Sequence, residues 1–178
     1  VAGHTVAAIA WTILVAALLA LMIIVTRFVA VAGSSTTLGL VVGWGALFQL
    51  AGLVTPVMLS PDVYSYIVYG RIHGLYGGNA YRDVPAGFTA DPFLAMVYWD
   101  QVPSFYGPLW TVISSGLAAA GGDHLGLTVV LFRLISALGV VAAAGALWLL
   151  TRSLGLTTAA QSMVLWLWNP LTIIEAGM

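Results

Sequence analysis

Side chains suited to chemistry lie close together in one short part of this sequence. Residues 60–72, SPDVYSYIVYGRI, contain an aspartate, three tyrosines and an arginine. In a helix, Asp62, Tyr66, Tyr69 and His73 would share one face, because residues three or four apart lie together. A carboxylate in such a row can take a proton from a substrate hydroxyl group, and the phenols and imidazole can line a polar substrate.

Local signals predict where this helix begins and ends. Ser60 suits the N-cap position, Pro61 suits the first helical position, and Asp62 falls in the first turn, which favours negative charge. The segment GLYGG, residues 74–78, predicts the end of the helix. Asp62 therefore suits two roles, a capping charge or a reactive carboxylate, and its spacing alone leaves both open. The tyrosines likewise suit anchoring at a membrane interface as well as substrate contact.

Metal chemistry is not predicted. The chain has no cysteine, and His73 has no second histidine or acid at ligand spacing. Asp83, Asp91 and Asp100 are scattered along the sequence and are interpreted as solvated loop charges.

The elements that must position these residues are strongly apolar. Hydrophobic residues make up 61% of the chain and charged residues 6%, and the mean hydropathy is +1.05. A helix needs about 20 apolar residues to cross a bilayer, and several such runs occur. The composition predicts an all-α polytopic membrane protein. The net charge of -1 offers no basic patch, so nucleic acid is not an expected partner.

Five membrane spans and one long loop are expected. The spans are predicted at about residues 5–25, 38–59, 106–120, 126–150, and from 157 onward with an interruption at Asn169-Pro170. The loop, residues 60–105, is rich in Tyr and Trp, which disordered segments lack and membrane interfaces favour. We therefore expect it to be folded on one membrane face.

The two ends and the charges bear on completeness and orientation. The sequence begins with Val1 and ends in the apolar run LTIIEAGM, so we expect residues 1–178 to be a partial module of a larger polytopic protein. Arg27 lies on one side of the predicted topology and Arg71, Arg82 and Arg152 lie on the other. These are too few to assign orientation by the positive-inside rule.

Several motifs together resemble a known superfamily. They are SPDVYSY, YGRIHGLYGGNAYRDVP, YGPLW, FRLISAL and LWLWNPLTIIEAGM. Over roughly residues 38–178 they are similar to the GT-C polyprenol-phosphate-sugar-dependent glycosyltransferases, most of all to actinobacterial polyprenol-phosphomannose-dependent α-1,6-mannosyltransferases. Asn79-Ala80-Tyr81 departs from the family's Asn-Pro-Tyr, which would leave this backbone less constrained.

The resemblance implies a function and a place. It implies a multi-pass enzyme of the plasma membrane, with its active site on the extracytoplasmic face. The enzyme would move a sugar, which the likeness to the subfamily implies is mannose, from a polyprenyl-phosphate donor to a glycan or glycolipid acceptor, without a further cofactor. The alternative from another class is a transporter or channel subunit, which would use broken helices such as WNPL and a buried Arg133.

The same resemblance implies roles for individual residues. A lipid-linked sugar phosphate already has a good leaving group, so the reaction needs a base for the acceptor hydroxyl, and Asp62 matches that need. Arg71, with Arg82 behind it, is the candidate for the donor phosphate, which arginine can bind with two hydrogen bonds. The aromatic rings expected to stack on sugar or prenyl chain are Tyr66, Tyr81, Trp99 and Tyr106.

Glu175 is the remaining acid. As an ionisable group in an apolar run it is a candidate for substrate binding. If Asn169-Pro170 ends the last span early, however, Glu175 would lie in a surface loop at little cost. Both interpretations stay open.

Overall fold

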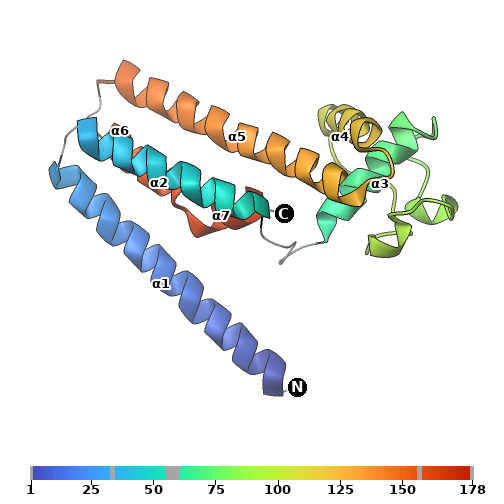
Figure 1. Ribbon diagram of the computed structural model, residues 1–178, viewed down its shortest axis with the longest axis horizontal. Coiled ribbons are helices and arrows are strands. Elements are labelled where there is room, and N and C mark those ends of the chain that lie inside the picture. The colour runs from blue at the N-terminus through green and yellow to red at the C-terminus, as the bar shows by residue number, and fades with distance from the viewer. Residues whose placement is uncertain (1, 33–34, 55–60, 156–157, 177–178) are drawn as a thin grey trace. The chain divides into compact units, whose positions relative to one another are not determined.

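The computed structural model describes residues 2–32, 35–54, 61–155 and 158–176, and every regular element within these ranges is a helix (Figure 1). The prediction of an all-α fold is confirmed for this part of the chain. The structure divides into two compact units. Residues 1–54 and 137–177 form one, here called the long-helix unit, and residues 55–136 form the other, the loop unit.

Apolar helices build the long-helix unit. It contains α1 (Ala2–Ala32), α2 (Ser35–Val54), α6 (Ala159–Leu167), α7 (Pro170–Ala176) and the later part of α5 (Leu125–Ser153). Gly45 lets α2 approach α6 closely, because a Cβ at this position would lie 2.7 Å from the Leu167 Cβ. Two indole N–H groups find carbonyl acceptors inside the unit: Trp166 donates to Val140 O and Trp168 to Val41 O. Satisfying such donors matters in an apolar setting, where an unpaired polar group is costly.

Three helices of the described residues are long and apolar enough to cross a membrane, namely Thr5–Val31, Thr37–Val54 and Leu125–Ser153. They correspond to the first, second and fourth expected spans. The third expected span is α4 (Pro108–Gly121), whose 14 residues give about 21 Å of helix, less than the hydrocarbon thickness. The last run is divided into α6 and α7, and Asn169 Oδ1 accepts a hydrogen bond from the Leu171 N–H at the start of α7. The predicted interruption at Asn169-Pro170 is therefore confirmed.

The loop unit is folded around its own core. Its elements are α3 (Asp62–Gly74), the short 3-10 helices η1 (Pro85–Gly87) and η2 (Leu94–Met96), α4, and residues 125–136 of α5. The helix predicted to start near Pro61 begins at Asp62 and is capped by Leu75; Ser60, the expected N-cap, lies outside the described residues. The fully buried core side chains come from α3, the following loop and α5, and they are Ile67, Val68, Ile72, Phe93 and Phe132.

Helices α3 and α4 touch through their backbones. A Cβ at Gly70 would collide with the carbonyl group of Ser114, and one at Gly74 would lie 3.0 Å from the Ser115 Cβ. Small residues on both sides thus bring the two helices together. The pair is the frame on which the polar residues of the loop unit are placed.

Candidate functional site

The predicted polar face of α3 is open only at its two ends. Asp62 is partly exposed and His73 is exposed, but Tyr69 is 3% exposed and donates its hydroxyl to Val102 O at 2.8 Å. The Tyr66 ring packs edge-on against Tyr106, with 4.8 Å between ring centres. The middle of the face is therefore packed by aromatic contacts, and substrate-binding roles for the partly buried Tyr66 and Tyr106 stay predictions.

The Asp62 end of α3 carries one acid beside phenols that keep their protons. Burial raises the pKa of Tyr69, and the charge of Asp62 raises it further. Burial also raises the pKa of Tyr106, with added contributions from Tyr66 and Asp62. Since raised pKa values favour the protonated phenol, Tyr69 and Tyr106 keep their protons at neutral pH. Its place in the first turn of α3 also exposes it to the positive end of the helix dipole.

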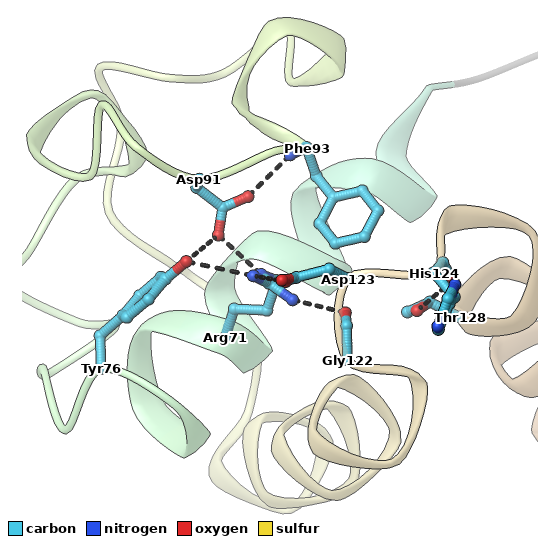
Figure 2. Close-up of polar contacts among 8 residues, drawn as sticks. All are labelled: Arg71, Tyr76, Asp91, Phe93, Gly122, Asp123, His124 and Thr128. Carbon is cyan, nitrogen blue, oxygen red and sulfur yellow. Dashed lines mark hydrogen bonds and ion pairs between the residues drawn. The ribbon is translucent and has the colours of Figure 1, made fainter.

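Arg71 is not placed to bind a substrate phosphate. Its side chain is 3% exposed, and its Nε donates to Asp91 Oδ2 at 2.7 Å (Figure 2). Its Nη1 donates to Gly122 O, and its Nη2 donates to Tyr76 and, at 2.7 Å, to Asp123 Oδ1. The sequence-based assignment of Arg71 to the donor phosphate is therefore corrected: every nitrogen of the guanidinium already binds protein oxygen.

The surroundings of the buried Arg71 side chain form a cluster, here called the Arg71 cluster. Its members are Arg71, Tyr76, Asp91, Phe93 and Asp123. The Arg71 Cζ lies 4.7 Å from the centre of the Phe93 ring, a cation–π distance. Burial lowers the pKa of Arg71, but the hydrogen bonds to Asp91, Asp123 and Tyr76 outweigh it and raise the pKa above its ordinary value. The guanidinium stays charged in the folded chain.

Asp91 was expected to be a solvated loop charge, and that expectation is wrong. Its side chain is fully buried. Oδ2 accepts from Arg71 and from the Tyr76 hydroxyl at 2.8 Å, and Oδ1 accepts the N–H of Phe93 at 2.8 Å. Both oxygens of this carboxylate are hydrogen-bonded inside the protein, as a buried charge requires.

Three further predicted residues lie elsewhere. Arg82 is exposed in the loop after α3, and Trp99 is 45% exposed, with its ring edge-on to Tyr98 at 4.9 Å. Glu175 lies in α7 of the long-helix unit, and its side chain is not among those described. Helix α7 decides against a surface loop at this position. Roles in substrate binding for the three stay predictions.

A cavity of about 340 Å³ lies at the other end of α3, and we call it the α3–α4 cavity. Its polar lining comes from His73, Asn79, Tyr81 and Thr111. The Tyr81 hydroxyl and Thr111 Oγ1 share a hydrogen bond of 2.7 Å. The remaining lining is small or apolar and consists of Gly78, Pro108 and Val112.

Sequence reasoning selected Tyr81 but missed Asn79 and Thr111. Asn79 reads as an ordinary turn residue and Thr111 as part of an apolar helix, so neither residue type stands out. The available signal was the joint YGPLW, since Pro108 fixes the start of α4 and so brings Thr111 to the loop.

The turn that carries Tyr81 is well constrained although it lacks the family's proline. Asn79 O accepts the N–H groups of Arg82 and Asp83 at 2.8 Å, and the Asn79 N–H donates to Asp83 Oδ2 at 2.6 Å. Asn79 Oδ1 accepts the Tyr81 N–H, and Ala80 is 1% exposed in the core. The expectation of a looser backbone is corrected. Asp83, expected to be a solvated charge, closes this turn.

Metal binding finds no support among the described residues, where no group of three His, Cys, Asp or Glu side chains is placed to hold an ion.

By helix length and composition the chain is an all-α membrane protein with a folded polar unit. The family described as α-(1→6)-mannopyranosyltransferase, N-terminal domain, matches residues 1–176, and the chain belongs to this family. An α-(1→6)-mannopyranosyltransferase of Mycobacterium tuberculosis is 34% identical over 139 residues, which are 72% of this chain and 22% of that protein. α-(1→6)-Mannopyranosyltransferase B of Corynebacterium glutamicum is 34% identical over 131 residues, 68% of this chain and 21% of that protein.

The chain thus spans about a fifth of the length of the curated relatives it matches. No solved structure matches it.

Proposed function

We propose that the protein is a membrane mannosyltransferase that moves mannose from a polyprenyl-phosphate donor to a glycan or glycolipid acceptor. Family membership over residues 1–176 supports the class of reaction. The names of the relatives, α-(1→6)-mannopyranosyltransferases, support mannose as the transferred sugar and an α-1,6 linkage as the product. The chain would supply the first part of the enzyme's membrane domain.

The observation that carries the proposal is the position of Asp62. Asp62 occupies the partly exposed start of α3, in the first turn of the helix and beside phenols that hold their protons. An acid in this position can accept the proton of an acceptor hydroxyl as that oxygen attacks the sugar carbon and the lipid phosphate leaves.

The donor phosphate needs a cation that the Arg71 cluster does not supply. Arg82 keeps an exposed side chain and stays the candidate from this chain; the rest of the length found in the relatives offers room for others. The three long apolar helices would hold the enzyme in the bilayer. We place the reaction at the extracytoplasmic face of the plasma membrane, as the likeness to GT-C transferases implies.

The substitution Asp62→Asn, made in the full natural protein, tests the proposal. Asparagine keeps the shape and caps a helix about as well as aspartate, but it does not accept a proton. We expect the initial rate of mannose transfer to fall by about 10²–10⁴-fold, with the affinity for the polyprenyl-phosphate donor nearly unchanged. The measurements are initial rates and donor binding in membranes or detergent.

Asp100→Asn is the matched control, because Asp100 is also a partly buried aspartate of the loop unit. It should keep its activity within a few fold. An Asp62→Asn enzyme that remains as active as this control would remove Asp62 from the reaction and leave a helix-capping role.

A further inference from the structure

We propose that the α3–α4 cavity is a subsite for a neutral sugar, which holds a unit of the acceptor chain away from the unit that reacts. The proposal rests on the transferase function proposed above and adds a binding site to it. Three observations support it: polar groups in the cavity lining that have unused hydrogen-bonding capacity, an ordered aromatic ring at the cavity edge, and the position of the cavity along α3.

Residues that line the cavity carry hydrogen-bonding groups that the described contacts do not use. Asn79 uses its Oδ1 to accept the Tyr81 N–H, which leaves the two donors of its amide nitrogen available. His73 adds an exposed imidazole. The Tyr81 and Thr111 hydroxyls bind each other and retain acceptor capacity. Amide and hydroxyl groups in an otherwise apolar cavity are what the hydroxyl groups of a sugar require.

Tyr81 supplies an aromatic face that is already held in place. The side chain is 42% exposed, yet its hydroxyl is fixed to Thr111 at 2.7 Å and its backbone N–H to Asn79 at 3.0 Å. A large ring with an apolar face and a bound polar end suits the C–H face of a pyranose. Because the ring is already ordered, binding would not have to spend conformational entropy on it.

The charge of the cavity favours a neutral sugar over a phosphate. The described residues that line it include no arginine, aspartate or glutamate, and among them only His73 and Tyr81 are titratable. Phosphate sites normally offer arginine or lysine, whereas Arg71 is closed off and Arg82 does not line the cavity. Its volume of about 340 Å³ lies at the small end of ligand sites, which fits a sugar unit better than a prenyl chain.

The position along α3 indicates which sugar would bind. Asp62 and His73 are eleven positions apart in one helix, which is about 16 Å along its axis. A ring in the cavity is therefore too far away for its own hydroxyl to react at Asp62. It belongs to a more distant unit of an extended acceptor whose end reaches Asp62.

The first experiment measures sugar binding directly. The probe is α-1,6-linked mannotriose, and the sample is the full natural protein, purified in detergent. Tyr81→Ala removes the ring, and Asn79→Asp keeps the oxygen that holds the turn but removes the amide donors. Each should weaken mannotriose binding by about tenfold, the upper range for an aromatic or hydrogen-bond contact. Tyr98→Ala, an exposed tyrosine of the same unit that does not line the cavity, should bind as the unaltered protein does. Equal binding by all variants, or no binding by the unaltered protein, would overturn the subsite.

The second experiment uses acceptor length. Tyr81→Ala should raise the KM for long α-1,6-mannan acceptors by about tenfold, leave the KM for a monosaccharide acceptor unchanged, and leave the donor KM unchanged. A rise in the donor KM would assign the cavity to the donor, and an equal effect on short and long acceptors would remove the distant-unit assignment. If the unaltered protein transfers no mannose at all, the proposed function fails, while the binding experiment still judges the subsite.

Discussion

The Arg71 cluster and the α3–α4 cavity are two polar regions of one small unit, and they use their polar groups in opposite ways. In the cluster, a charged guanidinium and a buried carboxylate saturate each other, with Tyr76, Gly122 and Phe93 completing the set. Around the cavity, neutral groups are held by a few hydrogen bonds and leave donors unused. The charged residues of the Arg71 cluster thus stabilise the fold, and the uncharged amide and hydroxyl groups line a cavity that a ligand can enter.

The difference has a physical origin. A buried charge costs several kcal/mol unless it is paired, so a protein that keeps one must surround it completely. A neutral amide or hydroxyl group at a surface cavity is solvated by water and can exchange that water for a ligand at little cost. In this unit, burial and saturation of donors separate structural from binding residues better than residue type does.

Among these substitutions, Arg71→Met should lower the free energy of unfolding most. A small loss would contradict the structural role assigned to the Arg71 cluster. Without the guanidinium, the Asp91 carboxylate stays buried with its strongest partner removed, so the free energy of unfolding should fall by about 3–5 kcal/mol. Denaturant titration of the protein in detergent, with proteolysis of the loop after α3 as a second readout, measures this. A normally stable variant with weakened donor binding would return Arg71 to the phosphate site.

A comparison of Asp91→Asn with Asp123→Asn tests whether burial sets the strength of the ion pairs with Arg71. Both carboxylates lie 2.7 Å from Arg71, but the Asp91 side chain is fully buried and the Asp123 side chain is 77% exposed. We expect Asp91→Asn to cost about 1.5–3 kcal/mol, because it weakens charged hydrogen bonds in the interior. Asp123→Asn should cost about 0–1 kcal/mol, since water screens the pair. The same denaturant titration decides, and equal losses would mean that burial does not set the strength of these pairs.

Tyr69 provides a smaller effect that depends on pH. Its folded pKa is raised above the ordinary value of 10.0, first by burial and then by the charge of Asp62. The folded state therefore favours the protonated phenol, and this stabilisation is complete below pH 10 and is lost as the pH rises through the folded pKa. Tyr69→Phe should cost about 0.5–1.5 kcal/mol at neutral pH, through the lost bond to Val102 O, and should reduce the alkaline loss.

Unfolding titrations from pH 8 upward, with the ultraviolet absorbance of tyrosinate as a parallel readout, measure both parts of this prediction. Tyr98→Phe is the control, because this ring is 71% exposed. An unaltered alkaline loss in Tyr69→Phe would assign that loss to another group.

The sequence predicted those parts of the fold that local signals determine. Pro61 and Asp62 marked the start of α3, Pro108 marked the start of α4, and the long apolar runs became α1, α2 and α5. The bounds of α4, Pro108–Gly121, lie close to the expected 106–120, but its assignment as a membrane span is not supported, because an apolar run of this length fits a core helix as well as a span. Here it packs on α3 through Gly70 and Ser114.

The site was less predictable because its contacts join residues that are distant in sequence. Arg71 and Asp91 are 20 positions apart, and Arg71 and Asp123 are 52 apart. Neither spacing marks a pair.

The contact of Gly70 with the Ser114 backbone has a consequence for motion. Neither partner has a flexible side chain there that could be compressed, so α3 and α4 meet as two hard surfaces and cannot slide past each other in small steps. Thr111 lies one turn before Ser114 on α4, so the wall of the cavity is carried by the same rigid pair as Asp62. We therefore expect acceptor entry to proceed without a closing lid in this unit, with a rate set by diffusion and orientation rather than by a slow conformational step.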